Sequence, residues 1–383
     1  MNRKNSKAKT LASAVLAALL LVQPLFFATA GEMAHLTPEA PEDMDPGLHI
    51  GTGARGSLDA DIQAASFTLP HSVLFDAQGN LVVVDTYSNM IRLVSDGKVS
   101  TYAGRRTQRN RNGHRQGYYL DGELEIALLN RPSDAVFNSK NELLIADSAN
   151  HVIRIVRDGS VYTFSGTAEG YADGGPETAK FNRPMAIAID GSDNIYVADT
   201  LNNCIRKIGP DGNVVTIAGM PGPGGYADGL ADGALFLEPS GIAVSQDGSI
   251  VYVADTGNHR IRKIEGGRVS TIAGISTEAD EDGYPVGGYR DGETSQAMFN
   301  QPGGLAIVGD IILVADSGNH MVRIIGRDGN VATLCGNGEP GDEKYNLMGA
   351  FLNRPMGVCY YGGFLYIADT VNNRIKALPF NGE

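Results

Sequence analysis

The sequence contains six copies of one segment, and this internal repetition limits the possible folds more than any other feature does. Each copy opens with a proline and has an aspartate fourteen to sixteen residues later. The prolines are Pro70, Pro132, Pro184, Pro239, Pro302 and Pro355, and the aspartates are Asp85, Asp147, Asp199, Asp255, Asp316 and Asp369. Successive copies begin 52 to 63 residues apart, which is too long for helical solenoid units and suits four strands with one long loop.

Every copy carries strand and turn signals. A short apolar run follows the proline, and a turn such as residues 76–80 leads into a β-branched run that ends in Val-Asp or Ala-Asp. A turn containing asparagine, an Ile-Arg strand, an Asp-Gly turn and a last strand such as residues 214–219 complete the unit. Four-stranded units in series predict an all-β fold, a six-bladed β-propeller of four-stranded antiparallel blades.

The repeat also predicts the blade boundaries. Blades are expected near residues 67–104, 129–166, 181–219, 236–274, 299–336 and 351–380, within a single propeller domain of residues 47–383. The sixth copy stops after its third strand, at Phe380. Residues 47–54 precede a stretch that copies the loop found after the missing strand in other repeats. We therefore expect this N-terminal strand to complete blade six and close the ring.

The first thirty residues have the pattern of an export signal. Four basic residues precede an apolar run from Leu11 to Phe27, and Ala28-Thr29-Ala30 gives a small-residue cleavage pattern. We predict a signal peptide at residues 1–30, an acidic linker at residues 31–46, and a secreted or otherwise extracytoplasmic protein at the cell surface or in the periplasm. An uncleaved membrane anchor is the alternative, because the apolar run is nearly long enough to span a bilayer. No transmembrane segment is expected in the mature chain.

The charge balance is acidic. The chain has 31 basic and 44 acidic residues, a net charge of −13, and loss of the leader would remove four basic residues and leave −17. Such a charge disfavours nonspecific binding to nucleic acid or anionic lipid, so no nucleic-acid partner is expected. Cys204, Cys335 and Cys359 lie in different repeats and fit no metal-binding spacing. We expect no disulfide framework and a monomeric protein.

The turn after each repeated aspartate resembles the turn of NHL-repeat propellers, a family named for an Asn-His-Leu tripeptide. Residues 255–262 read Asp-Thr-Gly-Asn-His-Arg-Ile-Arg. Comparable stretches are residues 147–154, 199–206, 316–323 and 369–376, whereas blade one has a looser Ser88-Asn89. The resemblance implies the propeller fold. It does not select a function, because the family includes protein-binding and RNA-binding platforms, sensor domains and the peptidylglycine amidating lyase.

Residues that recur in every blade are expected to stabilise the fold. The aspartate of each turn is predicted to accept turn N–H groups, and the arginine seven residues later is predicted to pair with it or with a neighbouring blade. His151, His259 and His320 are interpreted as hydrogen-bonding turn residues and not as metal ligands. Four connections between blades contain an Asp-Gly element, interpreted as a repeated turn with a calcium site as the alternative: Asp121, Asp173, Asp228 and Asp291.

Function is expected on the face that carries these turns and the long connections between blades. The residues just before the repeat prolines should surround the channel mouth there: Leu69, Arg131, Arg183, Glu238, Gln301 and Arg354. Arg131, Arg183 and Arg354 are candidate binding residues for a carboxylate or another small anion. The alternative is that each arginine pairs with the next blade.

One connection is strongly basic and marks a second candidate contact. It contains Arg105, Arg106, Arg109, Arg111, His114 and Arg115 within eleven residues that include no acid, followed by Tyr118 and Tyr119. A basic stretch with aromatic residues suits contact with a phosphate-bearing or acidic partner. It is equally consistent with a solvated loop that complements the acidic body of the protein or faces an anionic cell wall.

The sequence therefore favours a binding or scaffold propeller that engages a protein, peptide or glycan partner through rim loops. The alternative is a metal-dependent hydrolase or lyase at the channel mouth, with His71 and Asp134 as the candidate metal ligands. An amidating lyase would need three converging histidines, and only His71 lies at a corresponding position. No catalytic residue is assigned and no cofactor is expected, although calcium binding stays open.

Overall fold

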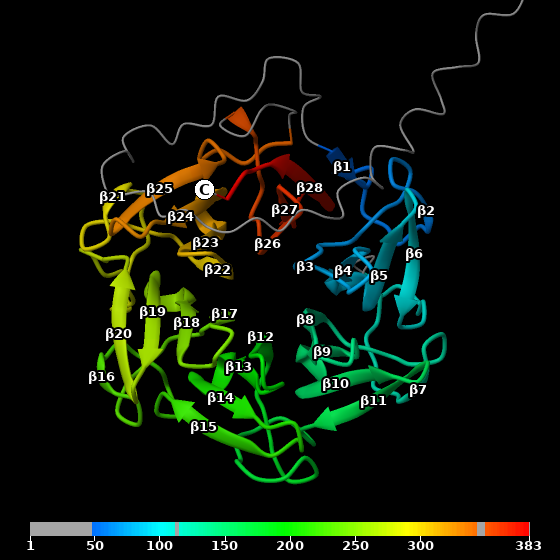
Figure 1. Ribbon diagram of the computed structural model, residues 1–383, viewed down its shortest axis with the longest axis horizontal. Coiled ribbons are helices and arrows are strands. Elements are labelled where there is room, and N and C mark those ends of the chain that lie inside the picture. Colours follow the sequence, from blue (N-terminus) through cyan, green and yellow to red (C-terminus); the bar gives the residue numbers. More distant parts are fainter. Residues whose placement is uncertain (1–47, 112–114, 343–348, 383) are drawn as a thin grey trace, which may run out of the picture. The chain divides into compact units, whose positions relative to one another are not determined.

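A computed structural model describes residues 48–111, 115–342 and 349–382 of the 383-residue chain. The strands in these ranges form six antiparallel sheets arranged as blades around a central axis (Figure 1). The predicted six-bladed β-propeller is therefore confirmed. The predicted leader and linker lie outside the described residues, as does His114 of the basic connection.

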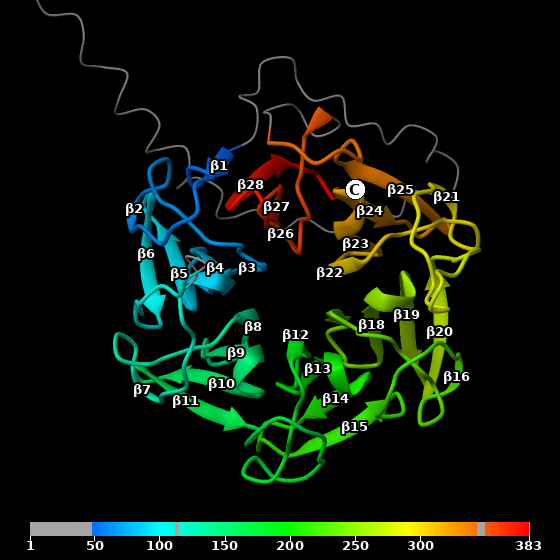
Figure 2. The same cartoon turned by 180° about the vertical axis from the view of Figure 1, so that it is seen from behind.

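In each blade the first strand of the repeat lies nearest the axis, as both views show (Figure 2). Blade one comprises β3 (Ser72–Phe75), β4 (Leu81–Asp85), β5 (Met90–Ser95), β6 (Lys98–Ala103) and β2 (Ala60–Asp61). Blade two comprises β8 (Pro132–Phe137), β9 (Leu143–Asp147), β10 (Val152–Arg157), β11 (Ser160–Ser165) and β7 (Gly122–Glu123). Blade three comprises β12 (Pro184–Ile189), β13 (Ile195–Asp199), β14 (Cys204–Ile208) and β15 (Val214–Ala218).

The second half of the ring continues the pattern. Blade four comprises β17 (Gly241–Val244), β18 (Ile250–Asp255), β19 (Arg260–Glu265), β20 (Arg268–Ala273) and β16 (Gly229–Leu230). Blade five comprises β22 (Pro302–Val308), β23 (Ile311–Asp316), β24 (Met321–Ile325), β25 (Asn330–Cys335) and β21 (Gly292–Glu293). Blade six comprises β26 (Gly357–Tyr361), β27 (Phe364–Asp369), β28 (Arg374–Pro379) and β1 (Leu48–Ile50). Short 3-10 helices join the second and third strands of blades one to five: η1 (Thr86–Ser88), η2 (Ser148–Asn150), η3 (Thr200–Asn202), η4 (Thr256–Asn258) and η5 (Ser317–Asn319).

Four blades contain a fifth strand that the four-strand prediction did not include. The two-residue strands β2, β7, β16 and β21 pair with the outermost strand of their blades, as Gly122 does with Val161. In blade three an isolated bridge between Gly174 and Val214 takes the same place. The connections that lead into blades one to five cross the outside of the blade before they return toward the axis, so their main chain pairs with an otherwise exposed sheet edge.

The N-terminal strand closes the ring as predicted. β1 pairs antiparallel with β28, with Leu48 opposite Ala377 and Ile50 opposite Ile375. It thereby supplies the outermost strand of blade six. Blade six therefore combines strands from the two ends of the described chain.

The hydrophobic core lies between consecutive blades. One core cluster, for example, joins Ile91 of blade one to Leu129 and Ile145 of blade two. Four phenylalanines at corresponding repeat positions are fully buried: Phe67, Phe181, Phe236 and Phe299. Near the axis the inner strands approach so closely that a Cβ atom at Gly357 would lie 2.3 Å from the carbonyl oxygen of His71. Glycine at this position therefore permits close contact between blades six and one.

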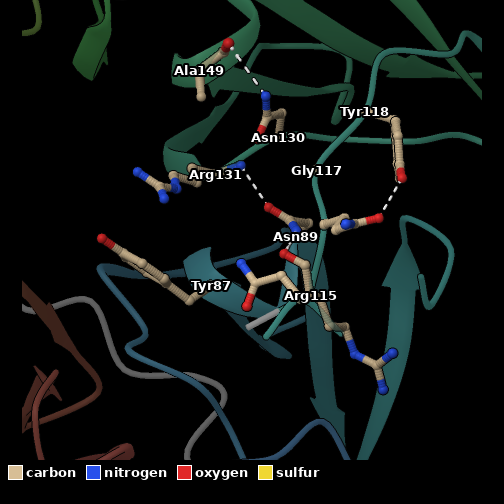
Figure 3. Close-up of a pocket in the computed structure, with 10 residues that line it drawn as sticks. Tyr87, Asn89, Arg115, Gly117, Tyr118, Asn130, Arg131 and Ala149 are labelled. Carbon is tan, nitrogen blue, oxygen red and sulfur yellow. Dashed lines mark hydrogen bonds between the residues drawn. The ribbon is translucent and has the colours of Figure 1, made fainter. Parts of the chain in front are cut away.

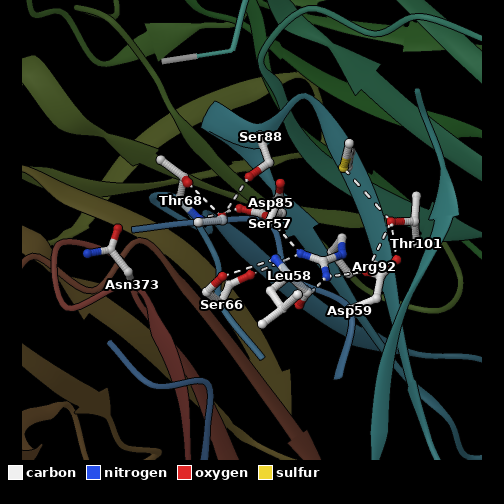
Figure 4. A network of polar contacts seen from close by, with 12 residues as sticks. Ser57, Leu58, Asp59, Ser66, Thr68, Asp85, Ser88, Arg92, Thr101 and Asn373 are labelled. Atoms are coloured by element: carbon white, nitrogen blue, oxygen red, sulfur yellow. Dashed lines mark hydrogen bonds and ion pairs between the residues drawn. The ribbon is translucent and has the colours of Figure 1, made fainter. Parts of the chain in front are cut away.

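Each blade also buries a charged pair. In blade one the Asp85 carboxylate lies 3.0 Å from Arg92 Nη1 and accepts the Thr68 N–H at 2.6 Å (Figure 4). Arg92 also donates to the Ser66 carbonyl and to Asp59 in the preceding connection. The pair recurs as Asp147–Arg154, Asp199–Arg206, Asp255–Arg262, Asp316–Arg323 and, in blade six, Asp369–Lys376. The predicted Asp–Arg pairing is confirmed, with lysine replacing arginine in blade six.

Candidate functional site

The turns after the repeated aspartates and the residues before the repeat prolines lie together on one face, which we term the rim face. The Tyr87 N–H in η1 donates to the Thr68 carbonyl at 3.1 Å, and the Ala149 N–H in η2 donates to the Asn130 carbonyl at 3.0 Å. The long connections lead into the inner strands at the same place. The rim face therefore carries the loops that differ from blade to blade.

The six pre-proline residues, which we term the mouth ring, share one backbone conformation. Leu69, Arg131, Arg183, Glu238, Gln301 and Arg354 have φ values between 48° and 52°. Non-glycine residues seldom adopt this left-handed region. The Arg131 N–H donates to Asn89 Oδ1 at 2.7 Å, and the Arg183 N–H donates to His151 Nδ1 at 3.2 Å. The main-chain N–H groups of the other four mouth-ring residues donate in the same way to the side chains of Asn203, His259, His320 and Asn373.

These hydrogen bonds, which we term blade staples, join each mouth-ring residue to the turn of the preceding blade. Because the staple uses the main-chain N–H, it fixes the backbone whichever side chain the residue carries. The role predicted for His151, His259 and His320 as hydrogen-bonding turn residues is confirmed. An Nδ1 that accepts a hydrogen bond places the proton of a neutral ring on Nε2. Burial lowers the pKa of all three imidazoles, which favours this neutral form.

The mouth-ring arginines differ from the buried repeat arginines in their partners. The Arg131 guanidinium lies over the Tyr87 ring, 4.9 Å from its centroid, and Arg354 donates to Gln301 Oε1 at 2.7 Å. Within residues 48–111, 115–342 and 349–382, neither these two side chains nor Arg183 forms an ion pair with an acid. In place of the alternative in which each arginine pairs with the next blade, Arg131 and Arg354 contact Tyr87 and Gln301 of the preceding blade.

A pocket of about 470 Å³ opens on the rim face between blades one and two (Figure 3). Its lining brings together three of the predicted binding residues, Arg115, Tyr118 and Arg131. The remaining lining residues are Tyr87, Asn89, Asn110, Gln116, Gly117, Asn130 and Ala149. Amide and aromatic side chains thus dominate its walls. Its volume falls in the range of small-molecule sites.

Arg115 borders this pocket with its main chain while its guanidinium points away from it (Figure 3). The Arg115 carbonyl accepts from Asn89 Nδ2 at 3.0 Å. Its guanidinium donates to Ser57 Oγ at 2.8 Å and to the Thr107 carbonyl at 2.5 Å. Burial, followed by the nearby Arg109 and Arg106, lowers the pKa of Arg115. Arg115 therefore anchors the basic connection to the loop before blade one.

The rest of the basic connection is exposed. Arg105, Arg109 and Arg111 lie at the surface, and Arg106 forms an ion pair with Asp59 at 3.0 Å. An isolated antiparallel bridge joins Arg109 to Arg115. Contact of these residues with a partner stays a prediction.

Tyr119 takes part in a contact that supports the scaffold. Its ring lies 4.9 Å from the Arg154 guanidinium, and its hydroxyl lies 2.6 Å from Thr163 Oγ1. Tyr171, Tyr226 and Tyr289 make the same contacts in later blades. The four carboxylates considered for calcium, Asp121, Asp173, Asp228 and Asp291, each pair with the buried arginine of their blade.

His71 and Asp134 lie half-buried near the axis, and the structure gives Asp134 a connecting role. Its carboxylate accepts the N–H groups of Ala135 and Ile187, both at 2.9 Å, and the hydroxyl of Ser72. It thus links blades one, two and three, and burial raises its pKa to about 6. Burial and the nearby Arg183 lower the pKa of His71 to about 4. In the described part of the chain, no group of three or more His, Cys, Asp or Glu side chains could hold a metal ion.

The sequence reasoning missed the pocket residues Tyr87, Asn89, Gln116 and Asn130. Asn89 and Asn130 occupy positions that have a structural role in every copy of the repeat. An asparagine at either position therefore gave no sign in the sequence of a binding role. Tyr87 did carry a signal, because the corresponding residues are Ala149, Leu201, Gly257, Gly318 and Val371.

Comparison with known proteins agrees with this architecture. The NHL repeat model matches residues 236–264 and 299–325. The protein SUPPRESSOR OF QUENCHING 1 of Arabidopsis thaliana is 31% identical over 314 residues, which cover 75% of this chain and 28% of that protein. NHL repeat-containing protein 2 of Gallus gallus is 27% identical over 367 residues, covering 83% of this chain and 49% of that protein. The chain thus spans between about a quarter and a half of these curated relatives.

Solved structures share the fold at low sequence identity. An auxiliary nutrient binding protein from Bacteroides ovatus has a TM-score of 0.60 and 15% identity, covering 86% of this chain and 75% of that one. A streptogramin B lyase has a TM-score of 0.51 and 12% identity, covering 84% of this chain and 96% of that one. Sheet order, ring closure and these likenesses define a six-bladed β-propeller. The repeated turn and the family match identify the chain as an NHL-repeat protein.

Proposed function

We propose that this chain is an extracytoplasmic binding scaffold that engages a protein, peptide or glycan partner through the loops of the rim face. The observation that carries this proposal is electrostatic. In the described ranges, the guanidinium groups of Arg131 and Arg183 have no acidic partner, whereas the repeat arginines are paired and the chain is acidic. Guanidinium groups of this kind bind carboxylates and other anions in a bidentate manner.

The rigidity of the mouth ring supports a binding role. The blade staples fix the backbone of all six mouth-ring residues before any partner arrives. A preformed surface loses less conformational entropy on binding than a flexible one. The nutrient binding proteins that share this fold add support by analogy alone.

Charge reversal tests the proposal. The R131E/R183E/R354E variant changes the mouth ring, and the K98E/K140E/R268E variant makes the same change in charge at exposed residues of the turns on the opposite face. We expect immobilised wild-type protein and the opposite-face variant to retain the same ligands from an envelope and culture-medium extract, and the mouth-ring variant to lose them. Equal retention by both variants would overturn the proposal.

The extracytoplasmic location rests on the predicted leader. Among the described residues, no helix is long and apolar enough to cross a membrane. N-terminal sequencing of protein recovered from expressing cells is expected to begin at Gly31. A chain that begins at Met1 in the soluble cell fraction would contradict the predicted location.

A metal-dependent hydrolase or lyase has less support, because Asp134 uses its carboxylate oxygens to connect blades. Elemental analysis of the purified protein, with thermal unfolding in calcium, zinc and chelator, tests this function. A stoichiometric metal whose removal lowers the Tm would favour the enzyme over the scaffold. A metal-free protein whose Tm does not change when either ion is added would eliminate the enzyme function.

A further inference from the structure

Tyr118 occupies a position that the repeat fills with glycine in the other blades. The Tyr118 carbonyl accepts a hydrogen bond from Asn150 Nδ2 at 3.0 Å. The residues whose carbonyls accept the corresponding bond elsewhere are Gly56, Gly170, Gly225, Gly288 and Gly341. The fold therefore needs the main chain here and has no need of an aromatic ring. Tyr118 nevertheless lines the pocket between blades one and two, and 49% of its surface is exposed.

Tyr87 is a second aromatic residue that the repeat does not need. Its N–H makes the same hydrogen bond that Ala149, Leu201 and Val371 make in other blades. Its ring lies under the Arg131 guanidinium and 6.4 Å from the His71 ring. Two exceptional tyrosines thus line one pocket, beside an arginine without an acidic partner in the described ranges.

The pocket also offers uncommitted hydrogen-bonding groups. Gln116 accepts from the Tyr118 hydroxyl through Oε1, which leaves its Nε2 donor without a partner among the described residues. Asn130 donates to the Ala149 carbonyl through Nδ2, which leaves its Oδ1 acceptor without a partner among the described residues. The pocket is therefore lined by hydrogen-bond donors, a hydrogen-bond acceptor, tyrosine rings and the Arg131 guanidinium. The Ala149 methyl is the sole aliphatic side chain among the lining residues.

We infer that this pocket binds an acidic saccharide, a pyranose unit that carries a carboxylate. This inference rests on the proposed binding function and names its ligand class. The positively polarised C–H groups of a sugar ring pack against electron-rich tyrosine faces. Sugar hydroxyls both donate and accept, which matches Gln116 Nε2 and Asn130 Oδ1. The Arg131 guanidinium pairs with the carboxylate in a bidentate manner.

The same features argue against a peptide ligand. Ala149 is the one aliphatic side chain among the lining residues, so the pocket offers no apolar subsite for an aliphatic peptide side chain. Strand addition needs an exposed sheet edge, and β2 and β7 cover the outer edges of the two blades that flank the pocket. A neutral sugar would leave the Arg131 charge unpaired.

The pseudo-symmetry supplies variants that the fold already tolerates. R131Q copies Gln301, Y118G copies the glycine of the other blades, and Y87L copies Leu201. As a control, R268Q makes the same substitution at an exposed arginine toward the opposite face, outside the pocket lining. Unchanged Tm values for all four would show that their binding data report on the pocket and not on folding.

The test uses an oligosaccharide array that contains uronate and sialate residues, their neutral counterparts, and a glutamate hexapeptide. Binding constants follow by calorimetry for the strongest acidic saccharide. We expect wild type and R268Q to bind it equally, and R131Q to bind it roughly tenfold or more weakly, because one charge-assisted hydrogen-bonded pair is lost. Y118G and Y87L should weaken binding in the same direction.

Several results would overturn the inference. These are no binding of any acidic saccharide, equal binding by wild type and R131Q, or binding of the neutral sugars alone. Binding of the hexapeptide alone, abolished in R131E/R183E/R354E, would also overturn it while leaving the proposed binding function intact. Retention of every ligand by that triple variant would overturn both.

Discussion

The blade staples lead to a quantitative prediction about stability. The H151L/H259L/H320L variant removes three Nδ1 acceptors from the N–H groups of Arg183, Gln301 and Arg354. A buried donor left without a partner costs about 1–3 kcal/mol, and these partly exposed donors should lie at the low end. The three sites belong to separate blade junctions, so their costs should add. We expect the free energy of unfolding to fall by about 3 kcal/mol, measured by urea denaturation at neutral pH.

The chain provides its own control. Asn89, Asn203 and Asn373 form the same staple at the other three junctions. The H151N/H259N/H320N variant should therefore keep stability within about 1 kcal/mol of wild type at neutral pH, since the acceptor is replaced.

The pH dependence of stability distinguishes staples formed by histidine from staples formed by asparagine. Burial lowers the pKa of the three histidines from the ordinary value of 6.5. The folded state then binds these protons more weakly than the unfolded state, so their stabilising contribution is complete above pH 6.5 and is lost as the pH falls. Between about pH 7 and about pH 5, wild type should lose more stability than the asparagine variant. His71 is present in both proteins, so its titration cancels in the difference.

Two outcomes would refute this reasoning. A leucine variant as stable as wild type would show that the staples contribute nothing. Parallel pH profiles of wild type and the asparagine variant would show that the three histidines do not titrate as the staple geometry requires.

Further predictions concern the buried charges, the packing at the axis and ring closure. D147A should cost about 3 kcal/mol or more because it removes the fully buried carboxylate that pairs with Arg154 and accepts the Asn130 N–H, whereas D121A removes a more exposed partner and should cost less in the same urea titration. G357A should cost about 1–3 kcal/mol because the new methyl group meets the neighbouring blade, while G233A, with room for a Cβ, should leave the unfolding midpoint unchanged. Deletion of residues 1–53 removes β1 and should lower the calorimetric Tm by several degrees, whereas a deletion that ends before β1 should not; equal Tm values would contradict the closure role.

The fold could be predicted because the same pattern of strands and turns recurs in six copies along the sequence. The position of β1 followed from the missing last strand of blade six, and the Asp–Arg pairing followed from its recurrence at a spacing of seven residues. The fifth strands carried no comparable signal. Pairs such as Gly122–Glu123 join the sheet through main-chain bonds that depend on the path of the connection.

The candidate site was only partly predictable. Arg131 and its equivalents were located because pseudo-symmetry fixes the mouth ring. The guanidinium of Arg115 turns toward Ser57, a contact between residues 58 positions apart that local sequence cannot specify. Tyr119 is predicted as a partner contact, and its packing against Arg154 becomes evident only when the fold brings the connection beside β10.

Hydrogen exchange of the protein with its partner tests the central claim most directly. If the rim face binds the partner, exchange should slow at the turn 86–89, the connection 116–118 and the mouth-ring segment 130–131. It should stay unchanged at the opposite-face turns 76–80 and 138–142. Slower exchange confined to those opposite-face turns would contradict the proposal that the rim face is the binding surface.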